Sequence, residues 1–382
     1  MAVPDLVALR RSLHSTPELS LVEHTTADRI EGWLTDLGLA PKRVAKTGIT
    51  AMVRGAKRGP TILARADIDA LPVTEATGLA FASRNAGVMH ACGHDFHAAG
   101  LVEVARRLAA SPPSRGNAKL LFQPGEEGAG GMQLCIDGGV LRRPDVSAAV
   151  GVHVWQNERV GKIGLVRGAC MAAVDDFEVR IVGRGGHAAM PHRSVDPVVV
   201  AAHVVTALQT LVARSVNPLD TAVVTVGSLQ AGTAFNVIPP DATLKGTVRT
   251  FSEPVRKLVA RRFKTLVKNV CRGLGATAEI EYRHFLPATV NDPAMVDLAW
   301  GVAEEIVGKR NVVEAEPSMG GEDMSLALRA VPGVFGFIGG DNGSKQTSYP
   351  HHHPRFDVDE ACLPIGAAFI EGFVRTFLEQ AS

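Results

Sequence analysis

The sequence predicts an α/β protein with a mainly parallel, mixed sheet, and three observations favour this fold class. Short apolar runs alternate with helical stretches, polar residues follow each run, and an alternating pattern of another kind interrupts this arrangement in the middle of the chain. Strands that alternate with helices form a sheet covered on both faces. Because roughly 100–200 residues are usual for one domain, a chain of 382 residues is expected to contain two domains.

Two amphipathic helices are expected at the start of the chain. Three leucines share one face of the first helix: Leu6, Leu9 and Leu13. The second helix is expected over residues 27–37, where Thr25 and Asp28 have the spacing of a capping box and Gly38 ends the helix.

Three apolar runs then predict buried strands, at residues 61–66, 119–122 and 148–152, with helices at 95–110 and 131–141 between them. Polar residues come directly after each run. Asp67 and Asp69 follow the first run, Glu126 and Glu127 follow the second, and His153 follows the third. The carboxyl ends of the strands line the ligand crevice in an open α/β sheet, so we expect these side chains on one edge.

The pattern changes at residue 177. Alternating segments and two helices, at 195–214 and 255–274, give the order βαββαβ, which is typical of a ferredoxin-like domain. Beyond it, the earlier pattern returns with a helix, a strand and a helix, at 293–307, 333–340 and 362–379.

We therefore predict that a small domain, residues 177–293, is inserted into a large one formed by residues 1–176 and 294–382. A cleft between two such bodies is a common place for a ligand site.

Composition excludes several functional classes. The 40 basic and 39 acidic residues leave a net charge of +1, so neither nucleic acid nor an anionic membrane is an expected partner. The N-terminus does not resemble a secretory signal, and no apolar run is expected to reach the length needed to span a membrane. Five widely spaced cysteines without a C-x-x-C pair argue against disulfides and favour the cytoplasm.

Metal-ligating residue types are concentrated in four separate segments. Cys92 and His94 flank a glycine, the glutamate pair and His153 follow strands, and three histidines adjoin a proline at 351–354. Thiolate, imidazole and carboxylate groups are the ligands that zinc-like metals prefer. Alone, the Cys92–His94 segment is equally compatible with a capping histidine beside a buried cysteine. The four segments together favour a metal site.

The adjacent carboxylates of Glu126 and Glu127 indicate a division of labour. Two neighbouring side chains do not easily point the same way, so we expect one to bind metal while the other faces a water molecule. A metal lowers the pKa of bound water, and the second carboxylate then accepts a proton as the water attacks. This arrangement suits amide hydrolysis.

The chain also resembles the M20 metallopeptidase family in motifs spread along its whole length. Within that family it is similar to the N-acyl-amino-acid amidohydrolases, which include hippurate hydrolases and auxin-conjugate hydrolases. The motifs that carry the resemblance are RADIDALPV, GVMHACGHDFHAAG, LLFQPGEEGAGG, GVHVW, GRGGHAAMPH, GTAFNVIPP, GTVRTF, PSMGGEDMS and HHHPRFDVDE.

The resemblance implies a catalytic domain with two divalent metal ions (Zn, Mn, Ni or Co) and an inserted lid domain through which subunits form a homodimer. The implied metal ligands are Cys92, His94, Glu127, His153 and His352, with His351 or His353 as possible replacements for His352. Glu126 would be the general base. His187 would bind the oxyanion, Asn236 and Arg249 would lie near the substrate, and Asp69 would orient a ligand.

The expected function is therefore metal-dependent hydrolysis of small N-acyl amino acids to a carboxylate and a free amino acid. Two alternatives remain from the residues. Cys92 could be a nucleophile activated by His94 without any metal, or the chain could bind a metal or ligand without catalysis.

Overall fold

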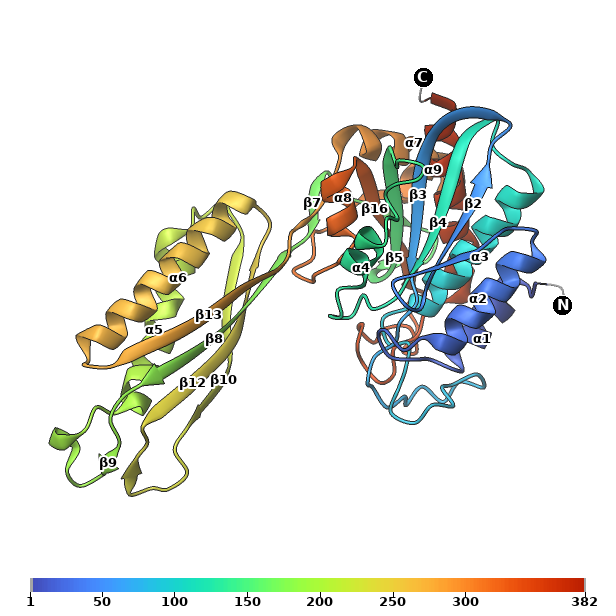
Figure 1. The fold of residues 1–382 in the computed structure, drawn as a ribbon. Coiled ribbons are helices and arrows are strands. Elements are labelled where there is room, and N and C mark those ends of the chain that lie inside the picture. The colour runs from blue at the N-terminus through green and yellow to red at the C-terminus, as the bar shows by residue number, and fades with distance from the viewer. Residues whose placement is uncertain (1–2, 381–382) are drawn as a thin grey trace. The chain divides into compact units, whose positions relative to one another are not determined.

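A mixed eight-stranded sheet forms the centre of the first of two units into which the chain divides (Figure 1). The computed structural model describes residues 3–380. The first unit contains the chain up to Cys170, Val290–Glu316, and the chain from Asp323 onward. The second unit contains Met171–Thr289 and Pro317–Glu322.

The sheet of the first unit combines parallel and antiparallel strands. Its order is β1 (Lys42–Val44), β2 (Gly48–Arg54), β4 (Arg115–Gln123), β3 (Lys57–Asp67), β5 (Ala148–Arg159), β16 (Gly333–Asp341), β6 (Ile163–Leu165) and β15 (Val312–Glu314). The four central strands from β4 to β16 run parallel, as do β6 and β15, whereas the remaining neighbours are antiparallel. The predicted α/β class with a mainly parallel, mixed sheet is confirmed.

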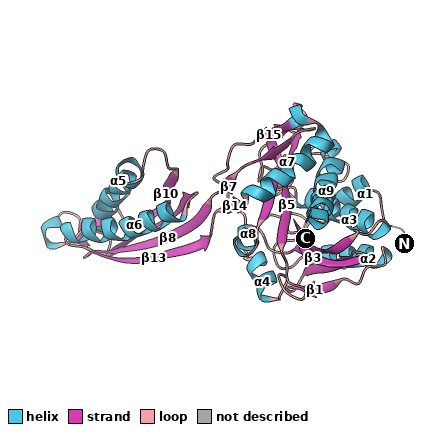
Figure 2. Ribbon diagram, turned by 90° about the horizontal axis from the view of Figure 1, so that it is seen from above, coloured by secondary structure: helices cyan, strands magenta, loops and turns pink. Residues whose placement is uncertain are grey.

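Helices cover this sheet on two sides. They are α1 (Leu6–His14), α2 (His24–Asp36), α3 (His94–Ala110), α4 (Gly131–Asp137), α7 (Pro293–Val307), α8 (Ser325–Ala330) and α9 (Leu363–Gln380), with short 3₁₀ turns at Lys309–Asn311 and Glu360–Cys362. Figure 2 shows α4 and α8 on one side of the strands and α1, α3 and α9 on the other. The apolar faces of α1, α2, α3, α7 and α9 form one continuous core with buried residues of the sheet.

The start of α2 differs from the capping box expected at Thr25 and Asp28. The helix begins at His24, and its Ncap residue Glu23 makes no side-chain cap. Instead, the carboxylate of Glu18 accepts hydrogen bonds from the backbone N–H groups of Thr25 and Thr26, at 3.1 and 2.8 Å. The expectation was wrong because a residue from the preceding loop satisfies the free donors of the first turn.

A buried ionic network fixes the N-terminal end of α3. Arg10 of α1 is 1% exposed, and its guanidinium donates to Asp95 at 3.0 Å and to Asp357 at 2.9 Å. His14 also contacts Asp95, through Nδ1 at 2.9 Å. Burial alone would lower the pKa of His14, but Asp95 and Glu75 outweigh it and raise the pKa to about 9. The network ties α1 and the C-terminal segment to the residue directly after His94.

The second unit is a four-stranded antiparallel sheet with two helices. In chain order it contains β8 (Ala173–Val182), α5 (Pro197–Ser215), β10 (Ala222–Ala231), β12 (Asp241–Thr250), α6 (Glu253–Gly273) and β13 (Thr277–Leu286), and the strands lie in the order β10-β12-β8-β13. Shorter elements are β9 (Gly186–His187), β11 (Val237–Ile238) and a 3₁₀ turn at Pro191–Arg193. Two further short strands, β7 (Gly168–Met171) and β14 (Thr289–Asn291), lie where the chain passes between the units.

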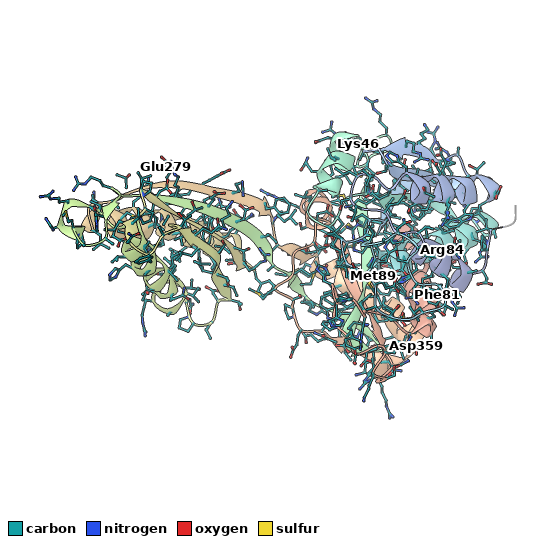
Figure 3. All side chains as sticks on the ribbon, turned by 90° about the horizontal axis from the view of Figure 1, so that it is seen from below. Lys46, Phe81, Arg84, Met89, Glu279 and Asp359 are labelled. Atoms are coloured by element: carbon teal, nitrogen blue, oxygen red, sulfur yellow. The ribbon has the colours of Figure 1, made fainter. Side chains whose placement is uncertain are left out.

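This unit has a hydrophobic core of its own, in which Phe177 packs against Phe263 with ring centroids 4.5 Å apart. Figure 3 shows side chains filling each unit, with the buried Met89 inside the first and the exposed Glu279 on the surface of the second.

Two helical segments are long and apolar enough to cross a membrane, Pro197–Ser215 and Glu360–Gln380. The sequence-based expectation that no apolar run has that length is therefore wrong for these helices. Length and composition are weak evidence, because core helices meet the same criteria. The second segment packs against α3 and α7 in the core of the first unit, and α5 packs against α6.

Candidate metal centre

Five side chains that the sequence predicts as metal ligands come together in the first unit. They belong to the turn before α3, the loop after β4, strand β5 and the loop before the C-terminal helix: Cys92, His94, Glu127, His153 and His352. Because β4, β3 and β5 are parallel neighbours, the loops that follow β3 and β4 leave the sheet at the same edge. Residues far apart in the sequence are thereby brought within reach of one another.

His94 is the first residue of α3 and is held by Asp69. Its Nδ1 lies 2.9 Å from the backbone oxygen of Asp69 and 3.2 Å from the Oδ1 atom of the same residue. Nδ1 therefore carries the proton and donates, which leaves a lone pair on Nε2. Nε2 is buried and has no hydrogen-bond partner among residues 3–380. Such an atom is costly to bury unless something pairs with it.

The turn before His94 requires a glycine. Gly93 has a φ of +86°, and a Cβ atom there would lie 2.4 Å from Cγ1 of Val154. The glycine thus allows the chain to turn tightly against β5 and place both Cys92 and His94 in the centre.

Cys92 and His153 face each other, with Sγ and Nε2 separated by 3.5 Å. Nδ1 of His153 lies 2.7 Å from the backbone oxygen of Val154, so it donates and leaves Nε2 as an acceptor. Burial, with His97 and His351 nearby, lowers the pKa of His153 well below its usual range. The imidazole is therefore neutral, the form in which histidine binds metals.

Glu127 lies between His94 and His352. Its Oε1 atom is 3.9 Å from Nε2 of His94 and 3.4 Å from Nε2 of His352. This oxygen is buried and accepts no hydrogen bond from any residue that the structure describes. The backbone N–H of Glu127 donates to Asp69 at 3.0 Å, which fixes the position of the glutamate pair.

The structure distinguishes the three histidines of the 351–353 loop. His351 uses Nε2 to contact the backbone oxygen of Val154 at 2.9 Å, and Nδ1 of His353 accepts a hydrogen bond from the backbone of Arg355. His352 has a left-handed backbone with φ of +67°, and its N–H donates to the oxygen of Ala91 at 2.8 Å. This conformation turns its ring toward Glu127.

These ligand atoms form overlapping groups, within each of which all atoms lie within 4.8 Å of one another. The groups are Cys92–His94–His153, Cys92–Glu127–His352 and His94–Glu126–Glu127. Burial lowers the pKa of His94, but Asp67, Asp69 and Cys92 outweigh it and the pKa rises well above its usual range. The local field thus favours a positive charge at Nε2 of His94, which a proton or a metal ion can supply. The thiol, imidazole and carboxylate donors fit a divalent transition metal or zinc.

Glu126, the predicted general base, adjoins this cluster. Its carboxylate is half-buried, and Oε1 accepts a hydrogen bond from the backbone of Asp323 at 3.4 Å. One of its oxygens lies in the same group as the ligand atoms of His94 and Glu127. Glu126 is thus close enough to act on a molecule bound at the cluster.

Asp69 lies directly behind the cluster, as expected for a residue that orients a ligand. It is 1% exposed and accepts hydrogen bonds from Ser20 Oγ at 2.6 Å and from the backbone of Glu127. Burial would raise its pKa, but the hydrogen bonds, led by that with His94, lower it. The charged carboxylate therefore links the start of α3 to the glutamate pair.

Sequence reasoning did not assign two other buried residues, Asp67 and His97. Asp67 contacts Nδ1 of His97 at 2.6 Å and Arg65 at 2.9 Å, and it lies 3.6 Å from Nε2 of His94. Nε2 of His97 accepts a hydrogen bond from the backbone N–H of Val154 at 2.9 Å. The position of Asp67 directly after a buried strand was the available signal.

The remaining predicted site residues belong to the second unit. His187 in β9 is exposed, and its Nδ1 accepts a hydrogen bond from the backbone of Ala189. Asn236 is exposed in the loop before β11. Arg249 in β12 is half-buried and donates to Thr247 Oγ1 at 2.5 Å.

The fold and the cluster define a member of the peptidase family M20/M25/M40. The model of that family matches residues 63–376, and the chain belongs to it. The predicted family and the enzyme class, a metal-dependent hydrolase, are confirmed.

Similar proteins cover almost the whole chain. An N-acetylcysteine deacetylase of Bacillus subtilis is 39% identical, over 98% of this chain and 97% of that protein. An IAA-amino acid hydrolase of Arabidopsis thaliana is 37% identical, over 98% of this chain and 86% of that protein. The crystal structure of the Bacillus subtilis YXEP protein, a dinuclear metal-binding peptidase of the M20 family, superposes with a TM-score of 0.86 at 37% identity, covering 98% of both chains.

We predict that His352→Ala lowers the affinity for divalent metal by about tenfold or more, since loss of a direct ligand should cost at least as much as loss of a residue that supports one. Equilibrium dialysis with metal analysis measures the change. His353→Ala, in the same loop, is the control and should bind metal as the unmodified chain does. Equal metal binding by both variants would contradict the position of His352 in the centre.

Proposed function

We propose that this chain hydrolyses the amide bond of small N-acyl amino acids, releasing a carboxylate and a free amino acid, with two divalent cations drawn from Zn, Mn, Ni and Co. The observation that carries this proposal is two buried atoms that make no hydrogen bond within residues 3–380, Nε2 of His94 and Oε1 of Glu127, beside a thiol and two further imidazoles. Two of the similar proteins, the N-acetylcysteine deacetylase and the IAA-amino acid hydrolase, support the substrate class by their names.

In this proposal the cations would be held by Cys92, His94, Glu127, His153 and His352. When bound, they supply Lewis-acid chemistry, lowering the pKa of a water molecule and polarising the scissile carbonyl. Asp69 keeps His94 in the tautomer that presents Nε2 to the cluster.

Glu126 moves the proton. Its neighbour Glu127 is directed to the ligand cluster through the hydrogen bond between its backbone and Asp69, and the Glu126 carboxylate is held by the backbone of Asp323. Glu126 accepts a proton as water attacks the carbonyl carbon, and it then gives this proton to the nitrogen of the departing amino acid. The C–N bond breaks in that second step.

The second unit would provide contacts to the substrate. His187 would donate a hydrogen bond to the oxyanion, and Asn236 would contact the substrate nearby. Arg249 would pair with the carboxylate of the amino acid, since a guanidinium binds a carboxylate through two parallel hydrogen bonds. The guanidinium of Arg249 is half-buried, and its hydrogen bonds go to Thr247 Oγ1 and to the oxygen of Val248.

A homodimer formed through the second unit, in the cytoplasm, is also part of this proposal. Large apolar side chains are exposed on that unit, among them Phe235, Leu219, Val237 and Val199. The five cysteines are all free and buried, which suits a reducing compartment.

Sedimentation velocity tests the homodimer. We expect the mass of a dimer, and a monomer at all concentrations would exclude the assembly.

We predict that Glu126→Gln abolishes turnover, with kcat reduced by about 100-fold or more because the proton acceptor is lost, while metal content stays unchanged. Amine release from acetyl- and benzoyl-amino acids measures the first effect, and metal analysis measures the second. Glu305→Gln, an exposed position on α7, is the matched control and should retain activity. Comparable rates in Glu126→Gln and the control would refute the assignment of the base.

A cysteine mechanism is the second candidate, because Sγ of Cys92 lies 3.5 Å from Nε2 of His153. The environment of the thiol does not favour it. Burial, with Glu127 and Glu126 nearby, raises the pKa of Cys92 well above its usual range, whereas nucleophilic thiols have lowered pKa values.

We therefore predict that prolonged chelation followed by removal of the chelator abolishes hydrolysis, and that Mn, Zn, Co or Ni restores it. The substrate panel above provides the assay. Activity that persists in protein shown by elemental analysis to be free of metal would favour the thiol mechanism.

A further inference from the structure

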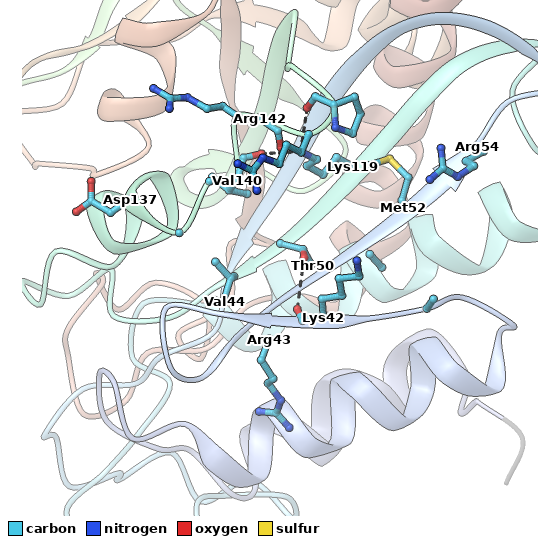
Figure 4. Close-up of a pocket in the computed structure, with 16 residues that line it drawn as sticks. Lys42, Arg43, Val44, Thr50, Met52, Arg54, Lys119, Asp137, Val140 and Arg142 are labelled. Carbon is cyan, nitrogen blue, oxygen red and sulfur yellow. Dashed lines mark hydrogen bonds between the residues drawn. The ribbon is translucent and has the colours of Figure 1, made fainter.

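A basic pocket lies on the first unit, away from the candidate metal centre. Its walls come from β1, β2, the middle of β4 and the segment 137–144 that follows α4 (Figure 4). It has a volume of about 680 Å³, within the range of roughly 300–1,000 Å³ that is usual for small-molecule sites. None of the predicted metal ligands or substrate-binding residues lines it.

The charge of the lining is one-sided. Six basic residues contribute to it, Lys42, Arg43, Arg54, Lys119, Arg142 and Arg143, against a single acidic residue, Asp137. The whole chain carries a net charge of only +1, so this is a local concentration of positive charge. A concave surface lined by one sign of charge concentrates counter-ions.

Four of these cations have no compensating partner. Arg43 forms ion pairs with Asp28 and Glu31 of α2. By contrast, the side chains of Lys42, Arg54, Arg142 and Arg143 make no hydrogen bond or ion pair within residues 3–380. Other arginines of the first unit, such as Arg10 and Arg107, are paired with carboxylates.

A buried lysine holds the wall that carries two of these arginines. Lys119 is 5% exposed, and its ammonium donates to the backbone oxygens of Val140, Arg142 and Pro144, at 2.9, 2.8 and 3.1 Å. All three of its donors are used, so the loop is fixed to β4 and a buried positive charge lies beneath it. Burying an ammonium is costly unless it is well paired.

The backbone of the same wall is strained at Arg143. Its φ of +56° is left-handed, a region that favours glycine or asparagine. The uncompensated charges of this wall indicate a surface suited to an anion.

The opposite wall is the uncovered face of the sheet edge. Lys42 pairs in register with Thr50, and Met52 pairs with Lys119, so β1, β2 and β4 present one continuous face to the pocket. The strands provide Lys42 and Arg54 at the rim, with Met52 and Val44 as apolar surface. Figure 4 shows Lys42 and Arg54 on the strands and Arg142 on the segment of the other wall.

We propose that this pocket binds a small polyanion that carries two or more phosphate groups. Arginine guanidinium groups bind phosphate through paired, charge-assisted hydrogen bonds, and four uncompensated cations match the charge of a di- or triphosphate. The limited volume of the pocket, about 680 Å³, favours a small ligand over a nucleic acid, which needs an extended basic surface. The proposal does not depend on the metal centre or on the reaction.

The test uses isothermal titration calorimetry with inorganic tripolyphosphate and with ATP. Both ligands are titrated in excess magnesium, which limits the removal of other divalent ions from the protein by these phosphates. The combined variant Arg54→Gln, Arg142→Gln and Arg143→Gln should weaken binding of tripolyphosphate by about tenfold or more, because three charge-assisted contacts are lost. A matched control, Arg261→Gln, Arg262→Gln and Lys268→Gln, removes the same charge from exposed positions on α6 and should bind as the unmodified chain does.

The two ligands distinguish a phosphate chain alone from a nucleotide. Tighter binding of ATP would indicate that the apolar wall receives the base, and equal binding would indicate recognition of the phosphates only. Either result supports the site, provided that the pocket variant binds the ligand more weakly than the unmodified chain does. Equal affinity in the pocket variant and the α6 control, or no binding by the unmodified chain, would overturn the proposal. If the triple variant does not fold, Arg142→Gln alone should still show a smaller loss.

Discussion

The candidate site depends on one constraint: polar atoms buried at the edge of the sheet must be paired. Nδ1 of His94 meets this condition through Asp69, and Nε2 of the same ring makes no hydrogen bond with any residue between 3 and 380. Oε1 of Glu127, 3.9 Å from that nitrogen, also makes no hydrogen bond with the described residues. A cation held by these residues would satisfy both atoms, and the thiol and further imidazoles nearby would serve as additional ligands.

The surrounding fold maintains this arrangement through residues that do not themselves face the cluster. Asp69 contacts His94 and the backbone of Glu127, so a single carboxylate positions two of the predicted ligands. The buried Arg10–Asp95 pair fixes the first turn of α3 from the opposite side. Breaking such a buried pair by removing one partner typically costs about 3–5 kcal/mol. Ionic contacts inside the first unit therefore stabilise the fold and orient the ligands at once.

Much of this could be predicted because the order of elements places polar residues after strands. Asp69 and the glutamate pair follow β3 and β4, and parallel strands bring their carboxyl ends together. Among the three consecutive histidines, the family resemblance favoured His352 but left His351 and His353 open. The direction of the His352 ring toward Glu127 depends on its left-handed backbone and on its contact with Ala91, a residue more than 250 positions away in the sequence. Likewise, the Glu18 cap of α2 and the Asp67–His97 contact join separate segments, and local patterns carry no information about such pairs.

The basic pocket also could not be predicted from the sequence, because its cations are spread from Lys42 to Arg143 within a chain of nearly neutral charge.

The central claim is that a thiolate and several imidazoles share bound cations in this unit. X-ray absorption spectroscopy at the metal K-edge of zinc-loaded protein tests it directly. The account predicts a sulfur scatterer at about 2.3 Å from zinc, beside nitrogen and oxygen at about 2.0–2.2 Å, and loss of the sulfur in Cys92→Ala. A spectrum of the unmodified protein with nitrogen and oxygen neighbours alone would contradict it.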